Sequence, residues 1–196
     1  MLDHLVEKYE EILNALTLDA FAYTVTIPDS GQLAPAEAIH RLQLDPAALR
    51  TPEHVQPDDL TLIAVGDAIV TLDAVNPGPD RKEATDRLAG QGFRHWYLAD
   101  DIEGNTTLYA RYGDAEGEVR FPEPLAIPFT PWTDFLGPLT PYAPLLAPLY
   151  DDIEEVGNVN AICMAIIEHE SGVRFNKELL ERPRLFLPID QHRPSM

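Results

Sequence analysis

The stretch FRHWYLADDIEGNTTLYARYGDAEGEVRF, residues 93–121, decides the fold. Within it Leu108, Ala110 and Tyr112 alternate with more polar residues, and successive side chains of a strand point to opposite faces of a sheet. The two breaks in the pattern, at 100–104 and 113–115, are short, and short connections join antiparallel neighbours. We therefore predict an antiparallel meander of three strands, at residues 93–99, 106–112 and 116–121.

Upstream residues extend this sheet. Residues 60–65 and 68–75 are apolar runs separated by Gly66-Asp67, and two residues of this type between such runs indicate a hairpin. Residues 20–27 alternate in the manner of a half-buried strand, with Thr24 and Thr26 on the more polar side. Residues 185–189 form a terminal extended segment. The sheet is expected to contain five to six strands.

Two helices carry apolar stripes at helical spacing. The N-terminal stripe predicts a helix that packs on the sheet, and the second stripe includes Cys163, which we expect to be a buried, unreactive thiol. The stripes consist of Leu2, Leu5, Val6, Tyr9, Ile12, Leu13 and Leu16, and of Val159, Ile162, Cys163, Ile166 and Ile167. The predicted class is α+β, with an antiparallel sheet covered on one face by the N- and C-terminal helices.

The chain divides by composition into three parts that we expect to form one structural domain. Residues 1–121 hold the α+β core, residues 122–148 form a Pro-rich segment, and residues 149–196 form a helical segment packed on the core. The Pro-rich segment also contains Phe129, Trp132, Phe135 and Tyr142. Flexible linkers are polar, so this composition predicts an ordered, irregular strap.

The charge balance limits the possible partners. The chain has 33 acidic residues against 14 basic ones, a formal net charge of −19. Such a field repels nucleic-acid backbones and anionic lipid, and it accelerates encounter with a basic protein. Cys163 has no cysteine partner, the first residues are charged, and no apolar run approaches the ~20 residues of a membrane span. We expect a cytoplasmic protein without a membrane segment, and the sequence specifies no oligomeric state.

Catalytic signatures are missing from the sequence. It has no nucleophile elbow, P-loop, HExxH motif, paired cysteines or dinucleotide fingerprint, and its six histidines show no helical or strand ligand spacing. The residues Asp100, Asp101, Glu103 and Asn105 resemble part of a calcium loop but lack the alternating ligands and the closing glutamate. We predict a protein that is not an enzyme and uses no cofactor or metal.

The candidate binding residues are therefore carboxylates and accessible aromatic rings. The expected partner-binding residues are Asp100, Asp101 and Glu103 at a hairpin tip, Trp96 beside it, Trp132 in the strap, and the acidic cluster Asp151, Asp152, Glu154 and Glu155. An aromatic ring next to carboxylates suits an Arg- or Lys-rich surface.

These residues predict an acidic binding protein of the immunity or inhibitor type, which neutralises a basic protein partner. Two alternatives stay open at this point. One is a docking component of a larger bacterial assembly that uses the strap. The other is a metal-dependent hydrolase whose acids Asp73, Asp100 and Asp101 meet only in three dimensions.

Two stretches also resemble a known family. Val65–Leu72, VGDAIVTL, together with the strands that follow it, resembles the core of an uncharacterised, mainly actinobacterial domain-of-unknown-function family. Ser171–Pro183, SGVRFNKELLERP, is similar to the C-terminal segment of that family, where a helix ends. The similarity covers about half of the chain, and it implies a fold but no catalytic residues.

Overall fold

A computed structural model describes residues 2–16, 20–57, 59–73, 79–122, 130–151 and 158–189. Its centre is an open antiparallel sheet of seven strands in the order β6-β5-β4-β1-β3-β2-β7. The strands are β1 (Phe21–Pro28), β2 (Asp59–Val65), β3 (Ala68–Asp73), β4 (Phe93–Asp100), β5 (Thr106–Tyr112), β6 (Ala115–Phe121) and β7 (Leu185–Pro188). The class and the antiparallel pairing are confirmed.

The predicted number of strands, five to six, was too low. The extended segment near the C-terminus pairs with β2, where Leu185 lies opposite Leu62 and Pro188 opposite Asp59. A segment of four residues shows too little alternation to be recognised as a sheet edge. The meander β4-β5-β6 and the hairpin at Gly66-Asp67 have the predicted pairing.

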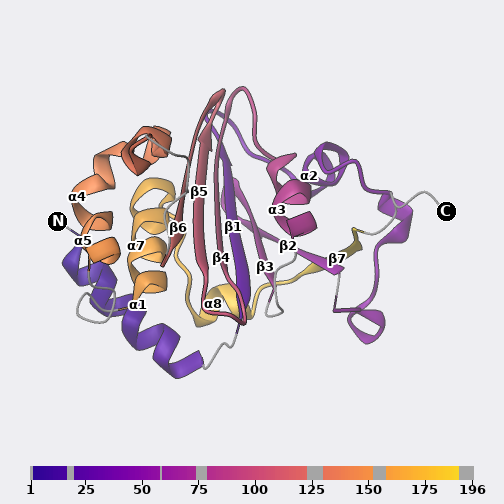
Figure 1. Cartoon of the computed structure of the whole chain (residues 1–196). Coiled ribbons are helices and arrows are strands. Elements are labelled where there is room, and N and C mark those ends of the chain that lie inside the picture. The colour runs from indigo at the N-terminus through magenta and orange to yellow at the C-terminus, as the bar shows by residue number, and fades with distance from the viewer. Residues whose placement is uncertain are drawn as a thin grey trace.

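A layer of helices covers the first face of the sheet (Figure 1). Its central helix α7 (Val159–Ser171) buries its apolar side chains from Val159 to Ile167, Cys163 included. Asn158 caps this helix by accepting a hydrogen bond from the Ala161 amide, and Gly172 ends it at φ 71°. A left-handed glycine at this position is a common way to end a helix.

The N-terminal helix α1 (Asp3–Leu16) packs mainly on α7 and forms an outer layer, where the sequence predicted direct packing on the sheet (Figure 1). Tyr9 is the buried residue of the helix, Leu2 just before it is also buried, and the other apolar side chains of the stripe are half-buried. The stripe therefore has the expected helical spacing, but it covers another helix.

Helices also cover part of the second face, which the predicted one-sided covering did not include. They are α2 (Pro35–Arg41) and α3 (Pro79–Asp86), on the opposite side of the sheet from α7 (Figure 1). A second apolar cluster lies here; it contains Leu33, Ala38, Ile39, Leu42, Leu60, Leu62, Ile69, Leu88 and Leu187. Its strand residues come from β2, β3 and β7, and the two short 3-10 turns η1 (Pro46–Ala48) and η2 (Pro52–His54) precede β2.

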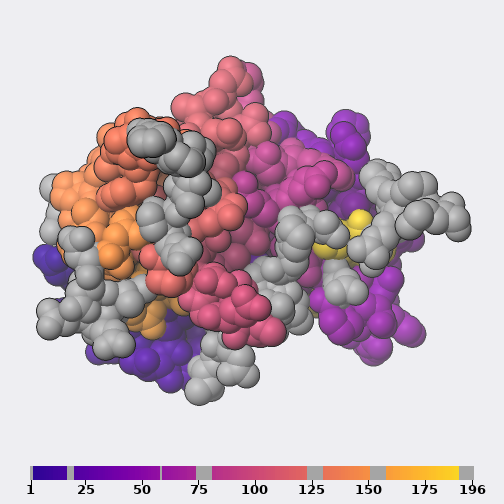
Figure 2. Space-filling view, viewed as in Figure 1, coloured from indigo at the N-terminus to yellow at the C-terminus, as the bar shows by residue number. Residues whose placement is uncertain are grey.

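The Pro-rich segment, where we expected an irregular strap, forms short helical turns from residue 130 onward. They are η3 (Trp132–Phe135), η4 (Gly137–Tyr142), α4 (Ala143–Leu146) and α5 (Pro148–Asp151). In Figure 2 these turns, in salmon to orange, form part of the surface beside the strands. Leu136, Leu139, Leu146 and Leu149 join the same apolar cluster as α7.

The strap approaches β6 very closely. A Cβ atom on Gly117 would lie 1.8 Å from the Leu136 carbonyl oxygen, and one on Gly137 would lie 2.0 Å from the Glu116 carbonyl oxygen. Both positions therefore require glycine.

The last short helix is α8 (Lys177–Leu180), which Asn176 caps. In the described part of the chain, no helix combines the length and apolar character needed to cross a membrane.

Candidate functional site

The turn between β4 and β5 is held by the side chain of Asp101. Its Oδ1 accepts hydrogen bonds from the backbone amides of Glu103, at 2.8 Å, and Asn105, at 2.9 Å. Partial burial alone would raise the pKa of Asp101, but the bonds from Asn105, Glu103 and Gly104 outweigh it and lower that pKa. The turn thereby presents Glu103 and Ile102 to solvent, and Ile102 is 69% exposed.

Asp100 has a different place from the other acids of the predicted tip. It is half-buried, and its Oδ1 accepts a hydrogen bond from Thr106 Oγ1 at 3.0 Å. Desolvation raises its pKa, against hydrogen bonds from Thr106 and Asn160. Asn160 belongs to the first turn of α7, so its hydrogen bonds with Asp100 and Thr106 connect the base of the hairpin to this helix.

The two tryptophans that we expected to bind a partner are not freely exposed at the surface. Trp96 is 0% exposed, which contradicts its predicted role at the surface: it lies on the face of β4 that α7 covers, in the main apolar cluster. Trp132 is half-buried, with its ring centroid 4.7 Å from that of Tyr150. Asp151 ends α5, but its side chain and the residues Asp152, Glu154 and Glu155 lie outside the described part of the structure.

The acids of the hydrolase alternative do not converge. Across β1, Ala22 pairs with Asp73 and Phe21 pairs with Asp100. Paired residues share a face and consecutive residues take opposite faces, so Asp73 and Asp100 point to opposite sides of the sheet. Among the described residues, no three His, Cys, Asp or Glu side chains are placed to hold a metal ion together.

A buried polar layer on the second face was missed by the sequence analysis. Thr24 Oγ1 lies 2.8 Å from Thr71 Oγ1, and Thr26 Oγ1 lies 2.8 Å from His95 Nδ1. All four residues are buried. The alternating threonines of β1 were interpreted as a half-buried face, because polar residues at period two normally face water.

Asp73 and Arg81 continue this layer beneath α3. The two side chains are buried, with Asp73 Oδ2 3.5 Å from Arg81 Nη1. That separation is too long for a good hydrogen bond, and Asp73 Oδ2 has no hydrogen-bond partner among the described atoms. Desolvation therefore exceeds the attraction of Arg81 and raises the pKa of Asp73 to about 6.

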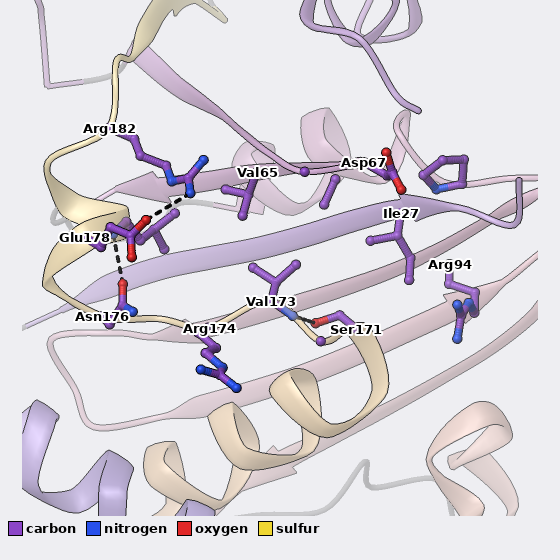
Figure 3. Close-up of a pocket in the computed structure, with 15 residues that line it drawn as sticks. Ile27, Val65, Asp67, Arg94, Ser171, Val173, Arg174, Asn176, Glu178 and Arg182 are labelled. Atoms are coloured by element: carbon purple, nitrogen blue, oxygen red, sulfur yellow. Dashed lines mark hydrogen bonds and ion pairs between the residues drawn. The ribbon is translucent and has the colours of Figure 1, made fainter. Parts of the chain in front are cut away.

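A cavity of about 520 Å³ opens at the end of the sheet where the β2-β3 turn meets the segment after α7 (Figure 3). Its basic residues come from three places: Arg94 is the second residue of β4, Arg174 follows α7 and Arg182 follows α8. Its apolar lining residues include Ile27, Val65, Ala68, Val173 and Leu179, and the carboxylates of Asp67 and Glu178 also line the cavity.

The two stretches that carry the family resemblance both contribute to this cavity, although about a hundred residues separate them. Each had an explanation as a turn or a helix end, so nothing in the sequence predicted that both would line one cavity. Comparison with family models, with curated proteins and with solved structures gave no significant match. The function is therefore inferred from the geometry of the sites.

Proposed function

We propose that this chain is a non-enzymatic binding protein of the immunity or inhibitor type, which engages a basic protein through the turn 101–105. The observation that carries the proposal is the exposure of Ile102, 69%, on a hydrogen-bonded turn between the carboxylates of Asp101 and Glu103. The exposed large apolar side chains in the described part of the chain are Leu49, Val55 and Ile102, and Ile102 is the most exposed of them.

An apolar anchor surrounded by charge has the composition of a binding hot spot. The anchor fills a pocket on the partner, while the charges at the rim select the partner and guide its approach. The bonds from Glu103 and Asn105 to Asp101 fix the backbone of the turn before binding. Such preorganisation reduces the entropy lost on association.

The net charge of −19 supports a basic partner in particular. A field of this size raises the association rate with a cationic surface, and salt screens it over a Debye length of ~10 Å at 0.1 M. Carboxylates at an exposed rim act mainly on the association rate, whereas the buried anchor governs dissociation.

The test compares two double variants in affinity capture from native lysate, followed by binding kinetics with the captured protein. In Ile102→Ser/Glu103→Gln the turn keeps Asp101 and hence its hydrogen bonds. The control, Leu49→Ser/Glu53→Gln, makes the same changes at another exposed apolar residue and at an exposed acidic residue four positions further along the chain. Since a hot-spot residue contributes ~2 kcal/mol or more, the turn variant should weaken binding more than about tenfold, and the control should not.

The captured protein should also be basic, and its association should slow as salt is added. A captured protein that is acidic, or one that binds both variants as well as the original chain, would contradict the proposal.

A further inference from the structure

Helix α3 is attached to the second face of the sheet by polar contacts (Figure 1). None of its described side chains, residues 81–86, belongs to an apolar cluster of the protein. The buried ones are Arg81 and Thr85, which lie one turn apart and therefore face the same way. The Thr85 hydroxyl donates within the helix, to the Arg81 carbonyl oxygen. A surface helix is normally held by an apolar stripe, and the side of α3 that faces the sheet is polar.

The buried contact beneath α3 is a weak one. Arg81 Nη1 lies 3.5 Å from Asp73 Oδ2 and donates a hydrogen bond to the Asp59 carbonyl oxygen at 3.3 Å. Asp73 Oδ2 has no hydrogen-bond partner among the described atoms. A buried ion pair stabilises a structure only when good hydrogen bonds offset the lost hydration of both charges. Water would therefore solvate this pair better once α3 moved away from the sheet.

The other contacts of α3 with the strands are partly exposed. Lys82 Nζ lies 3.1 Å from Glu118 and 3.8 Å from the centroid of the Tyr109 ring. Asp86 accepts a hydrogen bond from the Tyr109 hydroxyl at 2.9 Å and pairs with Arg111 at 3.1 Å. Solvent reaches roughly a third of the side chains of Lys82, Asp86 and Arg111. Salt can therefore screen both ion pairs.

The chain just after α3 is fixed by apolar burial, in contrast to the helix itself. Leu88, two residues beyond the helix, is fully buried in the second apolar cluster. Arg41 donates hydrogen bonds to the carbonyl oxygens of Leu88, at 3.2 Å, and Ala89, at 2.5 Å. An element that is fixed by burial at one end and held by polar contacts along its length can open as a unit about the fixed end.

We propose that α3 is a lid, which turns about Leu88-Ala89 and exposes the polar face of the sheet beneath it. That face includes the Asp73 carboxylate and the Tyr109 ring, both of which are buried when the lid is closed. Salt favours the open lid, because it screens the ion pairs that hold the lid closed. The lid acts whether or not the turn 101–105 binds a partner.

Hydrogen exchange of the full chain, measured by mass spectrometry at about 0.02 M and about 0.5 M NaCl, tests the lid. In low salt the amides of residues 83–86 should exchange at least about tenfold faster than those of residues 163–167 in α7, which open only with the whole fold. In high salt the α3 amides should exchange about fivefold faster again, relative to those of α7. Exchange of α3 as slow as that of α7, or no response of α3 to salt, would overturn the proposal.

A pair of variants separates the lid from a general effect of charge. Lys82→Gln removes one ion pair and the contact with Tyr109, so the α3 amides should exchange about threefold faster or more, and those of α7 should not. Lys177→Gln is the matched control, because Lys177 also lies on a short helix and pairs with one glutamate, Glu181, at 3.6 Å. Equal effects of the two variants on α3 exchange, including no effect of either, would refute the lid.

Oxidation by hydroxyl radicals shows whether opening uncovers the sheet. Tyr109, beneath Lys82, should be oxidised faster in high salt, in step with the exchange of α3. Tyr23 is buried as well but lies in the main apolar cluster with α7, so its oxidation should stay slow. Faster exchange of α3 with Tyr109 still protected would mean that the helix only frays in place, and would overturn the lid.

Discussion

Replacing Asp73 or His95 should change the pH dependence of stability in opposite directions, because burial raises the pKa of Asp73 and lowers the pKa of His95. In the folded protein the pKa of Asp73 rises from 3.8 to about 6, through desolvation that Arg81 and hydrogen bonds from Thr61 only partly offset. The folded state therefore holds this proton more tightly than the unfolded chain does. The stabilising contribution of Asp73 is complete below pH 3.8 and is lost as the pH rises through about 6.

His95 has the reverse sign. Desolvation lowers its pKa from 6.5 to about 4, with Asp86 acting to raise it and Lys82 and Arg111 acting to lower it further. Its ring Nε2 is buried without a hydrogen-bond partner among the described atoms, so a proton there would gain nothing to offset the lost hydration. The contribution of His95 is complete above pH 6.5 and is lost as the pH falls through about 4.

Each shift spans roughly two pKa units, which corresponds to ~3 kcal/mol because one unit is worth ~1.36 kcal/mol. In the original chain the two slopes largely cancel between pH 4 and 6.5. The difference in unfolding free energy between the original chain and Asp73→Asn should therefore fall by ~3 kcal/mol as the pH rises across this range. The corresponding difference for His95→Gln should rise by ~3 kcal/mol.

Urea denaturation at half-unit pH intervals measures both differences. Taking differences removes the titration of the remaining carboxylates, which all three proteins share. Any constant penalty, such as leaving Arg81 buried without its partner, shifts a curve without changing its slope. Differences that stay flat within ~0.5 kcal/mol, or slopes of the same sign for both variants, would refute the assignment of opposite shifts.

Two further predictions concern packing. Gly117→Ala should lose ~3 kcal/mol of stability, because its Cβ would collide with the Leu136 carbonyl, whereas Gly104→Ala, in open space at φ 80°, should lose only ~1 kcal/mol; equal losses in chemical denaturation would argue against the close contact. Cys163 is buried and burial raises its pKa, so a thiol reagent should label it slowly until denaturant is added; fast labelling of folded protein would contradict its place in the core.

The parts of the fold that the sequence predicted are those fixed by local patterns. The meander from Phe93 to Phe121 has clean alternation and short turns, and the stripe around Cys163 has a cap at each end. The place of α1 could not be predicted, because an apolar stripe specifies a face to be covered and does not specify what covers it. The same holds for β7, since its pairing with Leu60 and Leu62 is a long-range contact.

The same difference between local patterns and long-range contacts applies to the candidate sites. The turn at Asp101-Glu103 is local, and sequence analysis placed it at a hairpin tip, but it could not show that Asp101 is occupied in holding the turn. Trp96 was misplaced because alternation defines two faces of a strand without saying which one the helices cover. Arg94 and Arg174 line the same cavity only because α7 packs on the sheet, which no spacing in the sequence records.

The position of the basic residues bears on the acidic composition and on the proposed basic partner. Arg41 donates to the Leu88 and Ala89 carbonyls, and Arg81 and Arg111 contact Asp73 and Asp86. Arg81 is buried, and Arg41 and Arg111 are partly buried. The net charge of −19 sets the sign of the field outside the protein, which is negative and therefore favours a basic partner at the turn 101–105.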